Sequence, residues 1–429
     1  MNQYDVIVIG GGPSGLMACI AASAGGAKVL LADKGDKLGR KLGISGGGRC
    51  NVTNNKEPQE LIKHIPGNGR FLHSALAAFG PRDIIDFFGG LGIAFKEEDR
   101  GRMFPLSDKA KTVVDALVAQ VRRQGVDIRT DCPVRELLLG DGRVHGIRLR
   151  SGEEVRSRCV VVATGGKSVP HTGSTGDGYA WAKAAGHTIT ELYPTEVPIT
   201  SRDAFILDKE LQGLSLRGIE LTVCNDKGKP IVTHEGDMIF THFGISGPAA
   251  LRCSQFVVKE LKRSGADAVR LTIDLFPDRS VDEVAAESLQ LAGQEPKKAL
   301  KNVLRGYVPE RLIPLLLKKA GLDETVTFDH IPKGPWQELA RLLKAFPLRA
   351  TGTLSIEEAF VTGGGVSLKE IDPRTMQSKL AEGLFFCGEI LDVHGYTGGY
   401  NITAAFSTGH SAGAHAAELA LGAGREAVQ

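Results

Sequence analysis

The stretch "YDVIVIGGGPSGLMACIAASAGGAKVLLADKG" (residues 4–35) decides the fold. It opens with a mostly apolar run of strand length, residues 4–9, that is rich in Val and Ile. The pattern Gly10-x-Gly12-x-x-Gly15 follows, and a run of small residues then continues to about Ala24 as a helix. A second buried strand, residues 28–32, ends in Asp33. This order of strand, glycine turn, helix and strand predicts an α/β unit of the Rossmann type.

Each part of the pattern has a physical role in binding a dinucleotide. Gly10 makes the turn, Gly12 lets a pyrophosphate reach the helix N-terminus, and Gly15 allows close packing of helix and strand. Asp33 lies 18 residues after Gly15, where an acid accepts hydrogen bonds from ribose hydroxyls. Because all of these features agree in their context, the sequence predicts a dinucleotide site.

Composition narrows the class of protein. The chain has 429 residues and a formal charge of +2, with no basic stripe, so nucleic acid is an unlikely partner. Seven cysteines, odd in number and never arranged as CxxC, predict reduced thiols in a cytoplasmic protein and no metal site. No segment approaches about 18 continuous apolar residues, so we expect neither a signal peptide nor a membrane span. The sequence gives no indication of the oligomeric state.

A second glycine-rich stretch, "GRKLGISGGGRCNVTNN" (residues 39–55), mimics a phosphate-binding P-loop. It lacks the Lys and the Ser or Thr that reach phosphate and Mg²⁺, and it is not a strand–loop–helix element, so we reject that interpretation. Cys50 is a possible nucleophile, but a catalytic thiolate needs a base or a lowered pKa, and a packing role is the favoured interpretation.

Six motifs resemble those of the BaiN/YhiN-type NAD(P)/FAD-dependent oxidoreductases (aminoacetone oxidase family), a branch of the glutathione-reductase-like flavoproteins. They span almost the whole chain: "GRKLGISGGGRCNVTN", "GRMFPLSDKA" (101–110), "ATGGKSVPHTGSTGDGYAWAKAAGH" (163–187), "FTHFGISGPAAL" (240–251), "VTGGGV" (361–366) and "FCGEILDVHGYTGGYNI" (386–402). Asp33 departs from the family, which usually has Glu at this position.

The resemblance implies FAD as the cofactor. It places the backbone of Val134 at the adenine and Glu389 at the ribityl chain. It also directs the helix that begins near Asn401 toward the flavin pyrimidine. The residues expected to contact FAD are Gly10, Gly12, Pro13, Ser14, Gly15, Asp33, Lys34, Arg40, Lys41, Ser45, Gly46, Arg49, Cys50, Asn51, Val134, Thr164, Gly165, Gly388, Glu389, Asn401 and Ile402.

The expected architecture is a Rossmann-type, glutathione-reductase-like FAD-binding domain with an insertion. Its two parts are residues 1–193 and 353–429. Strand patterns around the turn at residues 225–228 predict a β-rich, barrel-like subdomain over residues 194–275. The capping box Ser280-x-x-Glu283 opens a small helical cap over residues 276–352.

The catalytic residues stay unknown at this level. His394 and Tyr396 lie in the expected flavin loop and could deliver a proton, although packing and loop hydrogen bonds are the favoured roles for both. A second GxGxxG fingerprint for NAD(P) is missing, so the electron donor is either NAD(P)H bound transiently or a substrate.

Three functions are compatible with the sequence. The favoured one is an FAD oxidoreductase acting on a small organic substrate, either reducing a conjugated C=C bond or oxidising an amine or ketone. The "STGDG" loop (174–178) is similar to one in fumarate-reductase-type flavoproteins, which supports alkene chemistry. The alternatives are an FAD-dependent tRNA-modifying enzyme and a flavin-binding protein without catalysis of its own.

Overall fold

The structure is a computed structural model that describes residues 3–331 and 333–426. The chain divides into two compact units. The first contains the described residues up to Tyr193 together with those from Phe360 onward. The second runs from Pro194 to Ala359, and each unit is described by itself below.

A seven-stranded sheet forms the centre of the first unit. Its order is β6-β2-β1-β9-β8-β7, with β18 also paired to β9. Strands β6, β2, β1, β9 and β18 pair in parallel, whereas β7, β8 and the start of β9 form an antiparallel meander. The bounds are β1 Tyr4–Ile9, β2 Val29–Ala32, β6 Asp127–Arg129, β7 Val134–Gly140, β8 Arg143–Leu149, β9 Glu154–Val162 and β18 Leu384–Phe386. The predicted Rossmann unit is confirmed.

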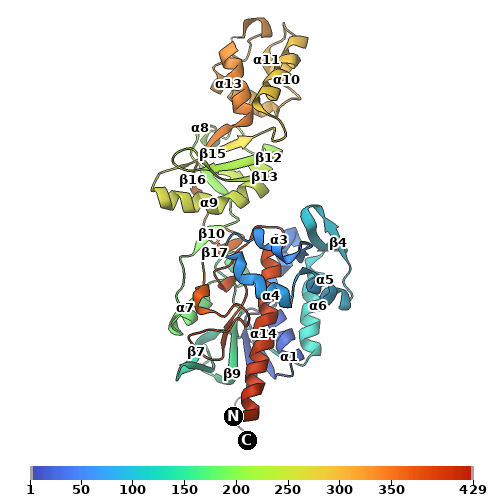
Figure 1. The fold of residues 1–429 in the computed structure, drawn as a ribbon, viewed down its shortest axis with the longest axis vertical. Coiled ribbons are helices and arrows are strands. Elements are labelled where there is room, and N and C mark those ends of the chain that lie inside the picture. Colours follow the sequence, from blue (N-terminus) through green and yellow to red (C-terminus); the bar gives the residue numbers. More distant parts are fainter. Residues whose placement is uncertain (1–2, 332, 427–429) are drawn as a thin grey trace. The chain divides into compact units, whose positions relative to one another are not determined.

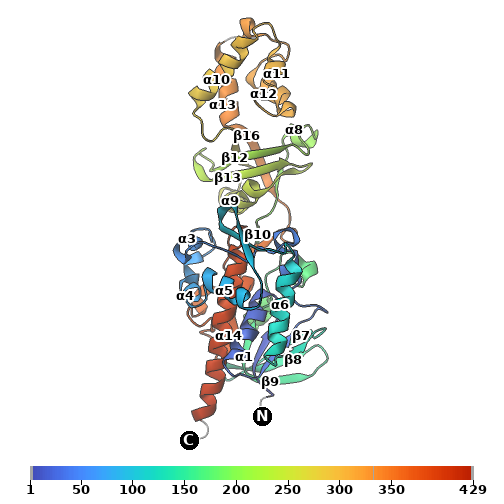
Figure 2. The ribbon, with the colours of Figure 1, turned by 90° about the vertical axis from the view of Figure 1, so that its right-hand side faces the viewer.

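Two helices from opposite ends of the chain pack along each other in this unit. They are α1 (Pro13–Ala24) and α14 (Tyr400–Glu426), and Figures 1 and 2 show them side by side near α6 (Ala110–Arg123). Glycine permits the close approach, because a Cβ atom on Gly413 would lie 2.2 Å from the carbonyl oxygen of Ala18. A Cβ atom on Gly409 would lie 2.3 Å from the carbonyl oxygen of Ser14.

The rest of the first unit is made of short elements around the sheet. Strands β3, β5 and β4 form a separate small sheet in that order. The bounds are α2 Arg40–Ile44, β3 Thr53–Asn54, α3 Pro58–Lys63, α4 His73–Ala78, α5 Pro81–Gly90, β4 Phe95–Glu98, β5 Arg102–Pro105, α7 Asp177–Ala184 and β17 Val361–Gly363. Strand β10 (Tyr193–Thr195) carries the chain into the second unit.

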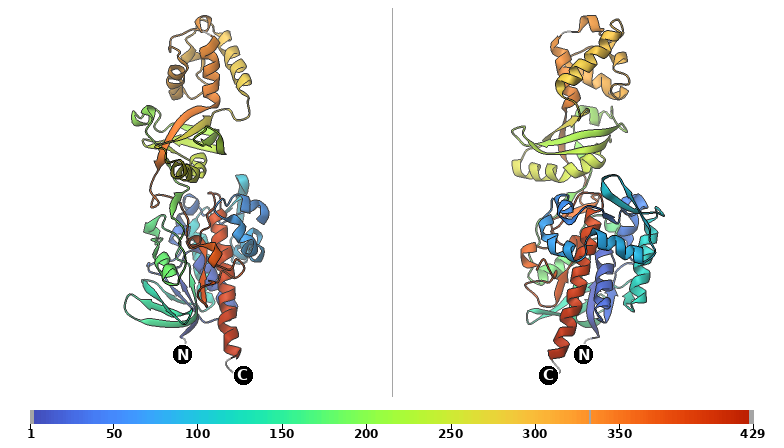
Figure 3. Two further views of the ribbon diagram at one scale, coloured as in Figure 1. Left: turned by 60° about the vertical axis from the view of Figure 1, so that its left-hand side comes forward. Right: turned by 45° about the vertical axis from the view of Figure 1, so that its right-hand side comes forward.

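The second unit contains a closed barrel of the order β11-β14-β13-β12-β15-β16. Helix α9 (Pro248–Ser264) packs against β12 and β13 (Figure 3). The predicted turn joins those two strands, with the Gly228 N–H donating to the Asn225 carbonyl at 2.9 Å. The other bounds are β11 Ile199–Ser201, α8 Ala204–Leu207, β12 Ser215–Cys224, β13 Pro230–Phe240, β14 Gly244–Ser246, β15 Val269–Asp274 and β16 Phe346–Thr353.

Helices complete the second unit. They are α10 Val281–Gln294, α11 Leu300–Val303, α12 Ile313–Ala320 and α13 Lys333–Lys344. The predicted capping box starts α10, because the Glu283 N–H donates to Ser280 Oγ at 3.2 Å and the Ser280 N–H donates to Glu283 Oε2 at 2.7 Å. One hydrophobic cluster runs from barrel residues such as Leu271 to helical residues such as Trp336. The expected barrel with a helical part is therefore confirmed.

Candidate functional site

The glycine turn after β1 has the geometry that a dinucleotide turn needs. Gly10 has a φ of +105°, and a Cβ atom there would lie 2.5 Å from the Ala163 carbonyl oxygen. A Cβ atom on Gly15 would lie 1.8 Å from the Gly10 carbonyl oxygen, so helix α1 approaches the turn closely. At Gly12, which is the N-cap of α1, no described atom beyond Gly12 itself and its two chain neighbours lies within 4 Å of the Cβ position. The first turn of α1, which includes Pro13 and the buried Ser14, therefore borders open space.

Asp33, at the end of β2, is hydrogen-bonded to its own loop. Its Oδ2 accepts from the Gly11 N–H at 2.6 Å, and its Oδ1 accepts from the Gly35 N–H at 2.7 Å. A carboxylate offers about four acceptor positions, so two remain for a ligand hydroxyl. The neighbouring Lys34 pairs with Asp177 at 2.7 Å.

The stretch 39–55 folds as helix α2 followed by a tight turn at Ser45–Gly48. The turn contains Gly46 and Gly47 with φ values of +57° and +68°. It follows a helix and not a strand, in agreement with the rejection of a P-loop. Cys50 is fully buried, and burial raises the pKa of its thiol to about 12. The group is therefore a thiol at neutral pH, which does not favour a nucleophilic role.

The C-terminal loop 388–402 packs directly against this stretch. Asn54 Nδ2 donates to the Gly398 carbonyl at 3.0 Å, and the hydroxyls of Thr53 and Thr403 lie 2.7 Å apart. A Cβ atom on Gly399 would lie only 2.6 Å from the Thr53 carbonyl oxygen. The two glycine-rich stretches singled out in the sequence thus form one site, although about 350 residues separate them.

Asn401, expected at the flavin edge, holds the loop that precedes its helix. Its Oδ1 accepts from the Gly395 N–H at 2.7 Å, and its Nδ2 donates to the Gly395 carbonyl at 2.8 Å and to the Tyr396 carbonyl at 3.2 Å. Helix α14 begins one residue earlier, at Tyr400, so Asn401 and Ile402 lie in its first turn. Helix N-termini carry partial positive charge and unpaired N–H donors.

A partly buried ion pair joins four motifs. Lys41 Nζ lies 2.7 Å from Glu389 Oε2 and donates to Ser168 Oγ at 2.9 Å. Glu389 Oε1 accepts from Ser168 Oγ at 2.9 Å and from the Thr362 N–H at 2.8 Å. Burial disfavours the charged carboxylate, but Lys41 and these hydrogen bonds outweigh it and hold the pKa of Glu389 below its usual range. One acceptor position of Glu389 stays available to a ligand hydroxyl.

Other residues expected at FAD have protein partners or backbone roles. The guanidinium of Arg49 pairs with Glu98 at 2.8 Å, and Arg40 pairs with Asp36. Ser45 Oγ donates to the Leu42 carbonyl at 2.7 Å. Gly165 and Gly388 have positive φ values of +70° and +77°, and Val134 is buried at the start of β7.

Two orphaned atoms test whether this site fits the cofactor that the sequence implies. Within the described part of the chain, the buried Asn51 Oδ1 and Thr164 Oγ1 have no hydrogen-bond partner. Buried polar atoms are nearly always paired, so both point to a polar ligand beside the stretch 39–55 and at the end of β9. Together with the open space at Gly12, they show that the residues present fit a dinucleotide cofactor.

The catalytic candidates lie in the same unit but differ in surroundings. The His394 imidazole is 2% exposed, and its Nε2 lies 3.5 Å from the hydroxyl oxygen of Tyr193. Tyr396 is buried, and its N–H donates to the His64 carbonyl at 3.0 Å. Tyr193 lies in a connecting segment outside every motif, so the sequence patterns did not single it out.

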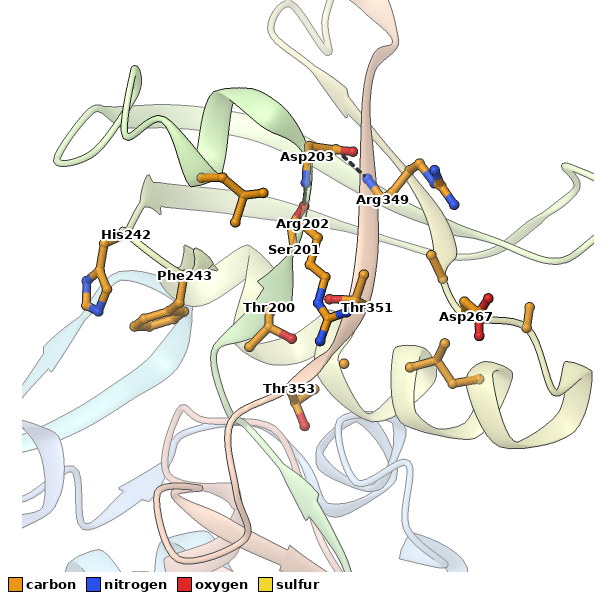
Figure 4. Close-up of a pocket in the computed structure, with 15 residues that line it drawn as sticks. Thr200, Ser201, Arg202, Asp203, His242, Phe243, Asp267, Arg349, Thr351 and Thr353 are labelled. Atoms are coloured by element: carbon orange, nitrogen blue, oxygen red, sulfur yellow. Dashed lines mark hydrogen bonds between the residues drawn. The ribbon is translucent and has the colours of Figure 1, made fainter.

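A separate groove of about 1150 Å³ lies beside β11 and β16 of the second unit (Figure 4). Its lining includes Arg202, Arg349, Asp203 and Asp267 together with several threonines. The two basic and two acidic side chains of the lining cancel in formal charge. The groove therefore has no excess of positive charge that would indicate an anion site.

The described residues contain no candidate metal cluster and no candidate membrane-spanning helix. No group of three or more His, Cys, Asp or Glu side chains among them could hold a metal ion. None of the helices they form has both the length and the apolar character needed to cross a membrane.

Comparison with known proteins identifies a matching family and several relatives of this chain. A family model described as "HI0933-like protein Rossmann domain" matches residues 4–415. The 3-dehydro-bile acid delta(4,6)-reductase of Clostridium scindens is 32% identical over 97% of this chain and 100% of its own length. The ribosomal RNA dihydrouridine synthase of Escherichia coli is 33% identical over 95% of this chain and 96% of its own.

A solved structure supports the fold alone. The 3-ketosteroid delta1-dehydrogenase from Sterolibacterium denitrificans superposes with a TM-score of 0.53 at 15% identity, covering 97% of this chain and 100% of that one. The family match spans nearly the whole sequence and agrees with the motifs and with the glycine-lined site. The chain therefore belongs to the HI0933-like Rossmann flavoprotein family of the BaiN/YhiN type and is an FAD-dependent oxidoreductase.

Proposed function

We propose that this protein reduces a C=C bond conjugated to a carbonyl group, with FAD as the redox group and NAD(P)H as the electron donor. The observation that carries the proposal is the chemistry shared by two full-length relatives. A 3-dehydro bile acid with Δ4,6 unsaturation has its C=C bonds conjugated to the 3-oxo group. Uridine, from which dihydrouridine is made, has its 5,6 double bond conjugated to the C4 carbonyl.

The residues of the first unit support this chemistry. Bound FAD supplies the hydride. The side chain of Asn401 holds the loop before α14 through its hydrogen bonds to Gly395. The N-terminus of α14 provides N–H donors and partial positive charge beside the glycine-rich stretch 39–55. The Lys41–Glu389 pair fixes the relative positions of α2 and the C-terminal loop. The partial positive charge at the start of α14 favours a bound ligand that carries or develops negative charge.

We infer that the substrate is a small organic enone, and that the reaction takes place in the cytoplasm. All seven cysteines are buried and none is joined in a disulfide, an arrangement that is usual in a reducing compartment. Uridine in RNA is the second candidate, favoured by the relative from Escherichia coli. The formal charge of +2 counts against it, because RNA-binding surfaces are usually strongly basic.

The cofactor-binding residues belong to the same proposal. Asn51 and Thr164 are expected to bond FAD, because both present an orphaned buried oxygen. Gly12 and the first turn of α1 are expected to hold its pyrophosphate, and Asp33 its ribose.

The experiment is an anaerobic two-step assay on the purified holoprotein. NADH or NADPH is added first, and bleaching of the flavin absorbance reports reduction. A 3-oxo-4,6-diene steroid, cyclohexenone or unmodified ribosomal RNA is then added, and return of the absorbance reports transfer to the acceptor. Mass spectrometry should find two added hydrogens in the acceptor that reoxidises the flavin.

Two controls separate the alternatives. Saturated analogues of each acceptor should leave the flavin reduced. If no conjugated acceptor reoxidises the flavin but an amine or a saturated ketone reduces it, the protein is an oxidase or dehydrogenase instead. If neither nicotinamide nor any substrate changes the flavin, the protein only binds it.

A further inference from the structure

Tyr193 and His394 come from distant parts of the first unit and meet edge to face. Their ring centroids lie 5.7 Å apart with an interplanar angle of 87°. The Tyr193 hydroxyl oxygen is 3.5 Å from His394 Nε2. His394 follows Glu389 in the C-terminal loop, whereas Tyr193 ends the first part of the unit.

The imidazole of this pair is held rigidly. The His394 backbone exchanges hydrogen bonds with Gly67, at 3.0 Å from the Gly67 N–H and at 3.2 Å to the Gly67 carbonyl. A Cβ atom on Gly67 would lie 2.1 Å from His394 Nδ1, so the ring packs flat against bare backbone. The Asn401 amide fixes the next residue, Gly395, through two hydrogen bonds. The ring therefore has little freedom to turn away from Tyr193.

The tyrosine is half-buried, and burial raises the pKa of its hydroxyl. The nearby Asp392 carboxylate raises it further. The group is consequently a neutral O–H, able to donate one hydrogen bond and to accept others. An oriented donor of this kind stabilises negative charge that develops on an oxygen during a reaction.

We propose that Tyr193 donates a hydrogen bond to the carbonyl oxygen of the conjugated substrate, and that His394 positions it by donating from Nε2–H to the Tyr193 oxygen. This inference rests on the proposed function and names the groups that bind its substrate. A donor chain of this kind polarises each member, so the Tyr193 hydroxyl becomes a better donor than an isolated phenol.

The chemistry balances without a further reagent. Addition of hydride to the β-carbon breaks the π component of the C=C bond and moves that electron pair toward the carbonyl oxygen. Tyr193 stabilises the oxygen in this state and keeps its own proton. The α-carbon then takes a proton from water, which gives the saturated ketone. The substrate gains one hydride and one proton.

The test uses Tyr193→Phe, with Tyr307→Phe as the matched control. Tyr307 is a half-buried tyrosine of the second unit whose hydroxyl donates to Glu287 Oε2 at 3.1 Å. The first readout is equilibrium binding of 4-nitrophenolate, an anion that mimics the charged oxygen, to the oxidised holoprotein. We expect Tyr193→Phe to weaken this binding about 10- to 100-fold, as for loss of a hydrogen bond to a charged group. Tyr307→Phe should bind as the wild type does.

The second readout separates the two half-reactions. Reduction of the flavin by NAD(P)H should be unchanged in Tyr193→Phe, whereas reoxidation by cyclohexenone should slow by about 10²- to 10³-fold. His394→Gln, which keeps an N–H donor near the position of Nε2, should lose less than His394→Leu in both readouts. This ordering would not arise if the imidazole served only to pack the loop.

Unchanged phenolate affinity and unchanged reoxidation in Tyr193→Phe would overturn the inference. If Tyr193→Phe fails to retain FAD, the ordering of the two His394 variants decides in its place, and equal losses in both would overturn the inference. The proposed function fails separately, when the wild-type protein transfers hydride to no conjugated acceptor. Phenolate binding that still depends on Tyr193 would then support the donor pair by itself.

Discussion

Asp33 accepts hydrogen bonds from two backbone amides of the loop in which it lies, Gly11 and Gly35. We therefore expect Asp33→Ala to have two effects. The affinity for FAD should fall by about 1–3 kcal/mol, because ribose hydroxyls and loop amides lose an acceptor. The FAD-free protein should also lose thermal stability. Fluorescence titration with FAD and thermal unfolding of the apoprotein measure the two effects.

Asp5→Ala is the matched control for this prediction. Asp5 also accepts from a backbone amide, the Lys28 N–H at 2.9 Å, but it lies at the opposite end of β1. It should leave the FAD dissociation constant unchanged. Equal affinities for FAD in the two variants would contradict a role of Asp33 at the ribose.

Single residues differ in how far the sequence can predict them. The Gly10–Gly15 turn could be predicted, because its requirement for bare backbone is local to a few residues. The pairing of Lys41 with Glu389 could not, because those residues lie 348 positions apart and nothing local specifies the contact. Tyr193 shows the same limit, since its partner His394 is 201 positions away.

At the scale of elements, the crossing of α1 and α14 depends on glycine. Gly413→Ala should destabilise the protein by about 1–3 kcal/mol, because a Cβ atom at 2.2 Å from the Ala18 carbonyl oxygen forces the helices apart. Gly422→Ala on the same helix is the control. Apart from its chain neighbours and the backbone of its own helix, no described atom lies within 4 Å of the Gly422 Cβ position. The substitution should therefore be neutral or stabilise by up to about 1 kcal/mol through helix propensity. Urea unfolding of both variants measures the difference, and equal stabilities would contradict the close crossing.

Hydrogen bonds among the buried Ser378 and His187 and the partly exposed Glu370 connect the segment after α7 with the loop before β18. His187 Nε2 lies 2.7 Å from Ser378 Oγ, and its Nδ1 lies 3.2 Å from Glu370 Oε2. The arrangement resembles a hydrolytic triad, but Ser378 Oγ already accepts the N–H groups of Leu380 and Ala381 at 3.0 and 2.9 Å. Both Ser378 and His187 are buried, so these hydrogen bonds hold the two segments together and Ser378 is not exposed to solvent as a nucleophile.

The burial of His187 predicts that the free energy of unfolding falls in mild acid. Burial lowers the pKa of His187 from 6.5, partly offset by Glu370. Below pH 6.5 the unfolded chain therefore binds a proton that the folded chain does not, and the free energy of unfolding falls until the folded imidazole is also protonated. His187→Gln should reduce the fall in stability between pH 7.5 and pH 5, as measured by urea unfolding at each pH. The exposed His171→Gln should follow the wild type, and an identical slope in His187→Gln would contradict the assignment.

The sequence predicts the type of an element more readily than it predicts which other element pairs with it. The capping box at Ser280 and the turn at residues 225–228 were predictable, because short-range hydrogen bonds define them. Closure of the barrel was only indicated by strand patterns. It depends on long-range pairs such as β11 with β16, which no local signal encodes.

At the scale of the whole molecule, each compact unit contains one of the two tryptophans. Trp181 is buried on α7 of the first unit, where its Nε1 donates to the Arg135 carbonyl at 2.9 Å. Trp336 is buried on α13 of the second unit. Single-tryptophan variants, Trp336→Phe and Trp181→Phe, therefore report the unfolding of one unit each.

We expect FAD to stabilise the first unit selectively, because every residue assigned to its binding lies there. At an FAD concentration about 100 times the dissociation constant, linkage stabilises a binding unit by about 2.7 kcal/mol. The urea midpoint reported by Trp181 should rise by that amount divided by the m-value, whereas the midpoint reported by Trp336 should stay constant. Fluorescence emission of the two variants, with and without FAD, measures both. A shared shift of the two midpoints would show that the units unfold as one, and a shift confined to Trp336 would place the cofactor in the barrel unit.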